Sequence, residues 1–135
     1  MVVGNPIWVM AEHRIERARR FRDYAREDLV NNRFDSAAFF AQQSAELLLK
    51  GELIRFTGSR PITLSLSELL NYLSRVLGRE VPSEVIRCAE SLEQHYVQAK
   101  YPDARINNYR RWEAEEAVKC IEVIWDYVQQ VVGGT

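Results

Sequence analysis

The sequence predicts an all-α protein, folded as an up-and-down antiparallel bundle of about five helices. Apolar residues recur at steps of three and four through most of the chain, which is the helical period, and no useful length alternates with the period of two that a strand needs. All four prolines fall between the periodic segments, and short connections make successive helices antiparallel neighbours. With 135 residues, 47% of them hydrophobic, the chain predicts one domain over 1–135 with an ordered core over 8–132.

The first two helices are predicted over 8–31 and 34–57, on either side of a turn at Asn31 and Asn32. The apolar stripe of the first helix consists of Ile15, Ala18, Phe21, Ala25 and Leu29. The second helix is apolar on most of its circumference, through Phe34, Ala37, Phe40, Ala41, Ala45, Leu47, Leu48, Ile54 and Phe56. A helix of that kind packs on several sides, so we expect it at the centre of the bundle.

The third helix is predicted to begin at a capping box. Ser65 and Glu68 have the spacing at which each side chain satisfies a free backbone N–H group of the other residue. Leu64 and Leu69 flank this pair as a hydrophobic staple, and Gly78 marks the end of the helix.

The fourth helix is predicted to start near Pro82 and to bury one apolar face. That face consists of Val85, Ala89, Leu92 and Tyr96. A loop from Lys100 to Tyr109 follows, and the fifth helix covers about 108–132.

The amino-acid composition argues against several classes of protein, namely nucleic-acid-coating, membrane-spanning and disulfide-rich secreted proteins. Lys and Arg total 18 against 19 acidic residues, so the net charge of -1 argues against a protein that coats nucleic acid, and any cationic site must be local. No window approaches the roughly 20 apolar residues of a membrane span, and the N-terminal segment lacks the basic region of a signal peptide. Cys88 and Cys120 are too few for a disulfide framework and are expected as small core residues in a reducing compartment. We therefore expect a cytoplasmic protein that does not engage membranes.

The sequence contains none of the residue spacings that are typical of metal or cofactor sites. His13 and His95 lie far apart in the sequence, the two cysteines stand alone, and no glycine-rich phosphate loop is present. The sequence therefore predicts neither a metal nor a cofactor.

The informative segment is 95–112, where cations and aromatic residues alternate around a single acid, Asp103. The cations are Lys100, Arg105, Arg110 and Arg111, and the aromatic residues are Tyr96, Tyr101, Tyr109 and Trp112. Guanidinium groups pair with phosphates and aromatic rings stack on bases, so the segment predicts a nucleotide or RNA site. The alternative is a tyrosine-anchored loop whose arginines pair with Glu113, Glu115 and Glu116.

A second polar group interrupts the apolar central helix at Gln43, Glu46 and Lys50. Glu46 and Lys50 stand four residues apart, with the acid nearer the N-terminus, which is the spacing of an ordinary stabilising pair. If this stripe faces another helix, the three side chains line a pocket. Both interpretations remain open at this point.

Taken together, these residues resemble the HEPN family, in particular its small stand-alone prokaryotic members. The matching pieces cover most of the chain: 34–46 with Lys50, the 63–70 segment, His95-Tyr96 and 101–104. The resemblance implies a helical bundle, usually a homodimer, with a nucleotide- or RNA-binding groove. Many members look like partners of small nucleotidyltransferases in toxin–antitoxin or defence-type pairs. Surplus aromatic residues, Trp8, Trp112 and Trp125 among them, also favour a homodimer interface.

Some family members are metal-independent ribonucleases, marked by an arginine followed after four to six residues by a histidine. Here the required positions before His95 hold Cys88, Ala89 and Glu90, and Arg87 stands one residue too early. The Thr-His pair frequent in relatives reads Thr63-Leu64. Whether the chain is an enzyme is therefore left undecided.

Three hypotheses follow. The first is a homodimeric module that binds nucleotide or RNA, or partners a nucleotidyltransferase. Its phosphate-binding residues are Lys100, Arg105 and Arg110, with Tyr96 and Tyr101 for stacking, and with His95 and Asp103 for the polar geometry of the groove. The second is a divergent ribonuclease with His95 as general acid–base and Arg87 as phosphate clamp. The third is a purely structural interaction protein.

Overall fold

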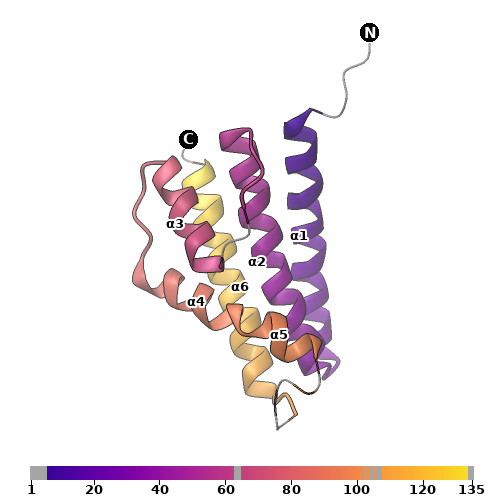
Figure 1. Cartoon of the computed structure of the whole chain (residues 1–135). Helices are drawn as coiled ribbons and strands as arrows, with labels where there is room; N and C mark the ends of the chain where they lie inside the picture. The colour runs from indigo at the N-terminus through magenta and orange to yellow at the C-terminus, as the bar shows by residue number, and fades with distance from the viewer. Residues whose placement is uncertain (1–5, 63–64, 102, 104, 106–107, 134–135) are drawn as a thin grey trace.

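The computed structural model describes residues 6–62, 65–101, 103, 105 and 108–133, and these residues form six helices. The helices are α1 (Ile7–Val30), α2 (Phe34–Thr57), α3 (Leu66–Val76), α4 (Ser83–Glu93), α5 (His95–Lys100) and α6 (Arg111–Gly133). No strand occurs in the described part of the chain. The long helices lie lengthwise, while α4 and α5 run across them (Figure 1). The predicted all-α bundle is confirmed.

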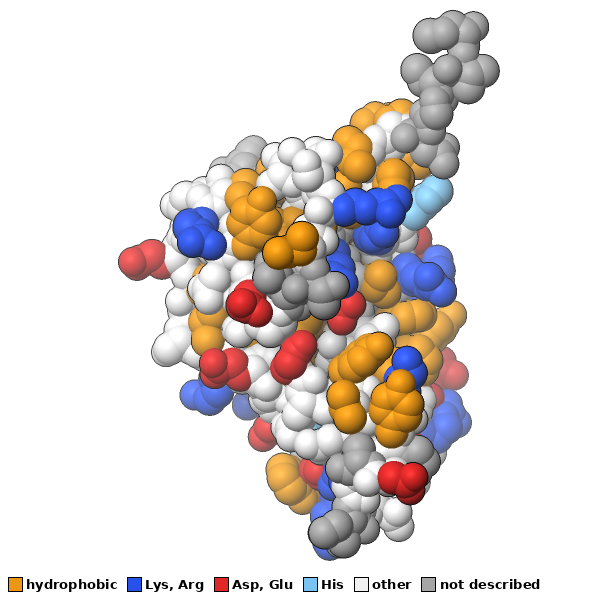
Figure 2. All heavy atoms as spheres, viewed as in Figure 1, with side chains coloured by type: hydrophobic (Ala, Val, Ile, Leu, Met, Phe, Trp, Pro, Cys, Tyr) orange, Lys and Arg blue, Asp and Glu red, His pale blue; other side chains and the backbone are white. Residues whose placement is uncertain are grey.

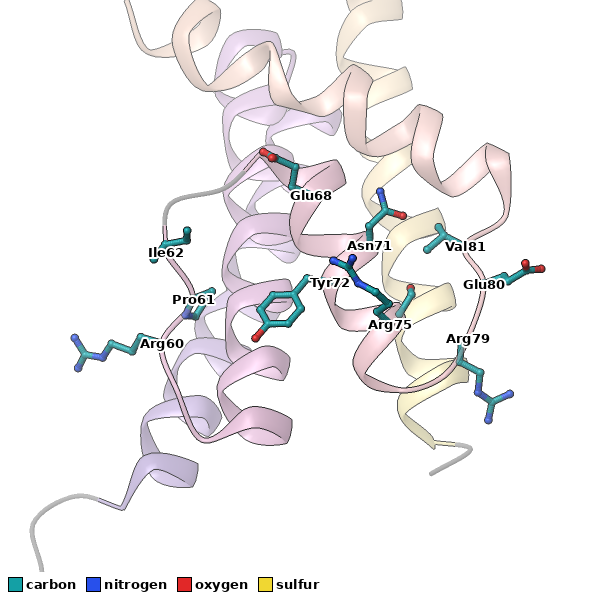
Figure 3. A pocket seen from close by; sticks show the side chains of 11 residues that line it. Arg60, Pro61, Ile62, Glu68, Asn71, Tyr72, Arg75, Arg79, Glu80 and Val81 are labelled. Carbon is teal, nitrogen blue, oxygen red and sulfur yellow. The ribbon is translucent and has the colours of Figure 1, made fainter.

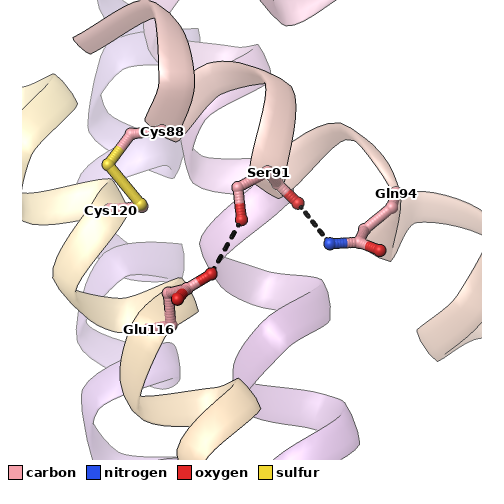
Figure 4. The surroundings of a disulfide bond; sticks show 5 residues. All are labelled: Cys88, Ser91, Gln94, Glu116 and Cys120. Atoms are coloured by element: carbon pink, nitrogen blue, oxygen red, sulfur yellow. Dashed lines mark hydrogen bonds between the residues drawn. A yellow bond between two sulfur atoms is a disulfide. The ribbon is translucent and has the colours of Figure 1, made fainter. Parts of the chain in front are cut away.

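The predicted fourth helix is divided into α4 and α5 at Gln94. The side-chain amide of Gln94 donates a 3.0 Å hydrogen bond to the carbonyl of Ser91, as Figure 4 shows. A continuous helix would offer that carbonyl to the backbone N–H of His95. Side-chain amides that bond nearby backbone compete with the helical ladder in this way. The division leaves His95 as the first residue of α5, buried in the protein.

Helices α1 and α2 form a tight antiparallel hairpin. Its turn is held by the buried carboxylate of Asp28, which accepts hydrogen bonds from Arg33 Nε at 2.7 Å and from the Ser36 hydroxyl. Asn32 takes a positive φ of 61°, which asparagine tolerates better than most residues. Along the hairpin Gly51 meets Ile15 so closely that an added Cβ would lie 2.7 Å from Ile15 Cγ1.

Helix α2 occupies the centre of the bundle, as predicted, and packs against α1, α3, α5 and α6. Its buried leucines join those of α3 and the apolar face of α6 in one core. The fully buried large apolar side chains are Leu48, Leu49, Leu53, Ile54, Leu66, Leu69, Leu70, Leu73, Leu92, Ile121 and Ile124. A short polar chain crosses this core, because Trp125 Nε1 donates to the Ser44 hydroxyl at 3.0 Å and that hydroxyl donates to the Ala18 carbonyl at 2.7 Å. It ties α6, α2 and α1 together.

The capping box at the start of α3 is confirmed. The Ser65 N–H donates to Glu68 Oε1 at 3.0 Å, and the Glu68 N–H donates to Ser65 Oγ at 3.2 Å. Leu64, the other half of the predicted staple, lies outside the described residues.

The prediction of two lone cysteines is wrong. Cys88 of α4 and Cys120 of α6 form a disulfide, with their Cα atoms 4.9 Å apart and both residues buried (Figure 4). Their sequence separation of 32 gives no local spacing signal, and only the packing of α4 on α6 brings the two sulfur atoms together. The inference of a reducing compartment from free thiols therefore loses its basis.

The surface mixes charges of both signs with apolar patches, as the face in Figure 2 shows. Trp8 and Trp112 are 59% and 60% exposed, whereas Trp125 is 2% exposed and belongs to the core. Of the three tryptophans expected to favour an interface, only two are thus available at the surface. None of the helices in the described ranges combines the length and apolar character that crossing a membrane requires.

Candidate functional site

The cation–aromatic segment lies at one end of the bundle, on α5, on the α5–α6 connection and at the start of α6 (Figure 1). Helix α5 rests against α2 and carries Tyr96 and Lys100. The described residues of the segment divide into an inner group, around His95, and an outer group, around Lys100.

His95 is the centre of the inner group. Its side chain is only 4% exposed, and its Nδ1 lies 2.8 Å from the hydroxyl oxygen of Tyr109. Burial lowers the pKa of His95 to about 4, against the smaller opposing effect of the Glu113 carboxylate. At neutral pH the imidazole is therefore uncharged and serves as a hydrogen-bond partner that anchors Tyr109.

Arg105 and Glu113 complete the inner group. The Arg105 guanidinium carbon lies 3.9 Å from the centre of the Tyr109 ring, and its Nη2 donates to Glu113 Oε1 at 2.9 Å. The same Glu113 oxygen accepts from the backbone N–H of Arg110 at 2.8 Å, just before α6 begins. Glu113 thus caps the helix and neutralises Arg105. The predicted alternative, an anchored loop with an arginine paired to Glu113, is confirmed for Arg105.

The outer group consists of exposed side chains. The Lys100 ammonium lies 5.2 Å from the ring centre of Tyr96 and 5.6 Å from that of Tyr101. Both rings are exposed, so the predicted burial of Tyr96 on the apolar face of the fourth helix is wrong, because the helix is divided before Tyr96. The side chain of Arg110 is exposed and forms no ion pair with any residue that the structure describes. Lys100 and Arg110 are therefore the two predicted phosphate-binding cations that remain available to a ligand.

Two further charged residues of the segment are placed differently. Arg111 donates to Asn32 Oδ1 at 2.5 Å and stands over the ring of Phe34, so it is tied to the turn between α1 and α2. Asp103 is exposed and has no hydrogen bond or ion pair within the described ranges, so its predicted role in fixing the groove stays a prediction.

Arg87, the predicted phosphate clamp, lies on α4 in a different environment from His95. It lines a cavity of about 330 Å³ beside the disulfide, together with acidic side chains of α4 and α6. Among the described residues, no hydrogen bond or ion pair joins Arg87 to His95. The charged groups that act on His95 are Glu113, Arg105 and Glu116.

The polar residues of α2 form a hydrogen-bonded chain along the helix. Gln43 Nε2 donates to Gln42 Oε1 at 2.7 Å, Gln42 Nε2 to Glu46 Oε1 at 3.3 Å, and Lys50 Nζ to Glu46 Oε2 at 2.9 Å. The predicted Glu46–Lys50 pair is confirmed, and the pocket-lining role of Gln43, Glu46 and Lys50 stays a prediction. Gln42, which is fully buried, was missed because a polar residue in a helix is usually a surface residue.

The pairing of His95 with Tyr109 was not predicted either. Its one available signal was the run of tyrosines itself, which does not show which hydroxyl reaches the imidazole. For Glu113 a local signal existed, since it stands three residues after Arg110, the position from which a glutamate caps a helix start.

No cluster of three or more His, Cys, Asp or Glu side chains within the described part of the chain is arranged to hold a metal ion.

Acidification from pH 7 to pH 5 is expected to lower the free energy of unfolding by about 2 kcal/mol through His95. In the unfolded chain the His95 imidazole takes up a proton near its ordinary pKa of 6.5, whereas in the folded protein it does so only near pH 4. The stability that this difference contributes is therefore fully present above pH 6.5, where the imidazole is uncharged in both states, and is lost as the pH falls from 6.5 towards 4. Urea denaturation at the two pH values measures the loss. A His95→Gln variant should lack this part of the pH dependence, and equal profiles for both proteins would contradict the prediction.

Comparison with known proteins agrees with the helical arrangement. Residues 11–131 match the family model described as HEPN domain. The crystal structure of TT1696 from Thermus thermophilus is similar with a TM-score of 0.78 and 32% identity, over 90% of this chain and 97% of that one. ST0689, an archaeal HEPN homologue, gives a TM-score of 0.69 and 28% identity over 90% and 97% of the two chains.

A HEPN domain protein from Thermotoga maritima has a TM-score of 0.70 at 24% identity over 90% of this chain and 98% of that one, a likeness of fold alone. No curated protein matches the sequence significantly. The family model covers nearly all of the helical bundle, from Ala11 in α1 to Val131 in α6. The chain belongs to the HEPN domain family.

Proposed function

We propose that this HEPN domain protein is a homodimeric module that binds nucleotide or RNA through the outer group: Tyr96, Lys100, Tyr101 and Arg110. The observation that carries the proposal is the Lys100 ammonium, which stands beside two exposed tyrosine rings and has no acidic partner in the described ranges. Such rings offer stacking platforms for bases, and the two cations offer charge for phosphates.

The inner group supports the outer one mechanically. His95, which is buried, and the partly buried Tyr109, Arg105 and Glu113 form a connected set that ties the connection between α5 and α6 to the bundle. Because Glu113 engages Arg105, we assign Arg105 to this anchoring role and leave phosphate contacts to Lys100 and Arg110.

A ribonuclease function receives no specific support. A general acid–base must exchange protons with the substrate, whereas the His95 imidazole is buried and its Nδ1 is engaged by Tyr109.

Titration of a fluorescent single-stranded oligoribonucleotide and of a nucleoside triphosphate at low salt tests the proposal. Lys100→Ala and Arg110→Ala are each expected to weaken binding about 5- to 10-fold and to flatten its salt dependence, because each removes one phosphate contact. Lys119→Ala is the matched control, since Lys119 is a cation of α6 beside the disulfide cavity and should leave binding unchanged. Absence of binding, or equal effects of all three substitutions, would contradict the proposal.

The homodimer and the partner are tested separately. Trp8 and Trp112 supply exposed apolar surface of the kind that interfaces cover. Sedimentation at micromolar concentration should show a dimer, and a monomer would remove that part of the proposal. From the family resemblance we also propose a small nucleotidyltransferase as partner. Co-expression with such a protein, followed by gel filtration, should give one joint peak, and separate peaks would count against the pairing.

A further inference from the structure

The Cys88–Cys120 disulfide borders a cavity between α4 and α6. The cavity has a volume of about 330 Å³, which is at the lower end of the range for small-ligand sites, and both cysteines line it. Cys88 is 5% exposed and Cys120 is 6% exposed, whereas Ala89 and Leu92 on the same helix are fully buried. The disulfide therefore faces a space of small-molecule size and is not sealed inside the core. We call this space the disulfide cavity and define it by the two cysteines with Glu84, Arg87, Glu115 and Lys119.

The disulfide cavity carries charges of both signs. Arg87 directly precedes Cys88 and Lys119 directly precedes Cys120, so each helix contributes one cation to the lining. Each helix also contributes an exposed carboxylate, Glu84 from α4 and Glu115 from α6. None of these four side chains forms a hydrogen bond or an ion pair with any residue in the described ranges. A ligand in the cavity would therefore meet both cations and carboxylates that are available for pairing.

The two walls of the cavity are also joined by contacts other than the disulfide. One turn along α4 from Cys88, the Ser91 hydroxyl donates to Glu116 Oε1 at 3.1 Å, so α4 and α6 share a hydrogen bond beside the sulfur atoms (Figure 4). This bond engages the third carboxylate of the lining. Apolar side chains of both helices belong to the common core as well. We therefore expect α4 to stay packed on α6 while the disulfide reacts.

We propose that the Cys88–Cys120 disulfide is a thiol–disulfide exchange site, and that its cavity takes a small thiol with both a carboxylate and an ammonium group, the chemistry of an amino-acid or short-peptide thiol. Arg87 and Lys119 pair with the carboxylate of this thiol. Glu84 and Glu115 pair with its ammonium group. The two cations also favour the thiolate, which is the form of a thiol that attacks a disulfide. The site lies on α4 and α6 and does not rest on the proposed function of the outer group.

The exchange consumes two thiols for each disulfide. The thiolate sulfur of the first bonds to one cysteine sulfur, the Cys88–Cys120 bond breaks, and the other cysteine leaves as a thiolate. The second thiol attacks the small molecule's sulfur in this mixed disulfide, which releases the remaining cysteine as a thiolate and a disulfide of the two small molecules. The protein gains two electrons, the two thiols lose them, and the protons of the two thiols end on Cys88 and Cys120.

Reduction of the full chain by two probe thiols tests the proposal. Glutathione carries carboxylates and an ammonium group, whereas 2-mercaptoethanol is uncharged. For each thiol, the rate of disulfide reduction on the folded protein is divided by the rate on the protein unfolded in urea, which cancels the intrinsic reactivity of the thiol. This quotient is expected to be about 5- to 10-fold higher for glutathione, because only glutathione forms the charge pairs of the cavity.

The Arg87→Ala/Lys119→Ala variant should lower the quotient for glutathione to that for 2-mercaptoethanol. Both side chains are exposed, so the oxidised variant should keep the wild-type circular dichroism and melting temperature. Arg75→Ala is the matched control, because Arg75 is an exposed arginine that lines a separate groove of about 1090 Å³ beside α3 (Figure 3). It should leave the preference for glutathione unchanged.

Equal quotients for the two thiols would overturn the inference, because they would show that the folded protein reacts without recognising the thiol. A preference for glutathione that survives in the Arg87→Ala/Lys119→Ala variant would also overturn it, and so would a disulfide that reacts only after the protein unfolds. None of these measurements involves a nucleotide or RNA, so this inference and the proposed function can fail independently.

Discussion

Removal of the Cys88–Cys120 disulfide is expected to lower the free energy of unfolding by about 3–4 kcal/mol, and the melting temperature by roughly 10 °C. The bond closes a chain segment with a sequence separation of 32 residues. It restricts the conformations of the unfolded chain, so the protein gains less conformational entropy when it unfolds. The link joins α4 to α6, which pack against each other in the folded protein. The size of the expected loss follows from the length of the closed segment.

Thermal and urea denaturation with and without dithiothreitol measure this effect. The matched control is the Cys88→Ala/Cys120→Ala variant, which should unfold as the reduced wild-type protein does and should not respond to the reductant. Equal stability of the oxidised and reduced wild-type protein would contradict the prediction.

Introduction of a large side chain at position 51 is expected to destabilise the protein by about 3 kcal/mol. At Gly51 an added Cβ would meet Ile15 Cγ1 at 2.7 Å and the Ala11 carbonyl oxygen at 3.2 Å, so α1 and α2 would have to separate. Gly51→Leu should show the full loss. Gly51→Ala should lose less, because alanine favours a helix over glycine by about 1 kcal/mol and so offsets part of the clash.

Gly133→Ala is the control for this experiment. Residue 133 ends α6, and a Cβ there would meet no heavy atom within 4 Å, so its stability should stay within about 0.5 kcal/mol of wild type. Chemical denaturation of the three variants under one condition compares them. Wild-type stability for Gly51→Leu would show that the α1–α2 contact adapts freely, contrary to the prediction.

Features that depend on neighbours in the sequence were the ones that could be predicted. The bounds of α2 agree with the predicted 34–57, because the apolar period and the left-handed Gly58 both act locally. The capping box at Ser65 was predictable for the same reason, since its two hydrogen bonds span three residues. The break at Gln94 was not, because glutamine carries no strong preference for ending a helix.

Within the candidate site, the residue types of 95–112 indicated a cation–aromatic surface but not which cations would be free. Arg105 and Arg110 look alike in the sequence. In the folded chain the Glu113 carboxylate accepts a hydrogen bond from the Arg105 guanidinium, but from Arg110 it accepts only the backbone N–H. The Arg110 side chain remains exposed. The groove beside α3 that Arg60, Arg75 and Arg79 line was not predicted, because these arginines belong to three separate stretches of the chain and form no motif.

The chain's residue order alone thus accounts for the helical class, the central position of α2 and the HEPN resemblance, since helical period and capping act between residues a few positions apart. The folded arrangement of the helices settles which distant side chains meet: Cys88 with Cys120, His95 with Tyr109, and Gly51 with Ile15. Such meetings depend on how each helix is rotated and how closely it approaches its neighbours, and those quantities arise from the packing of the whole core.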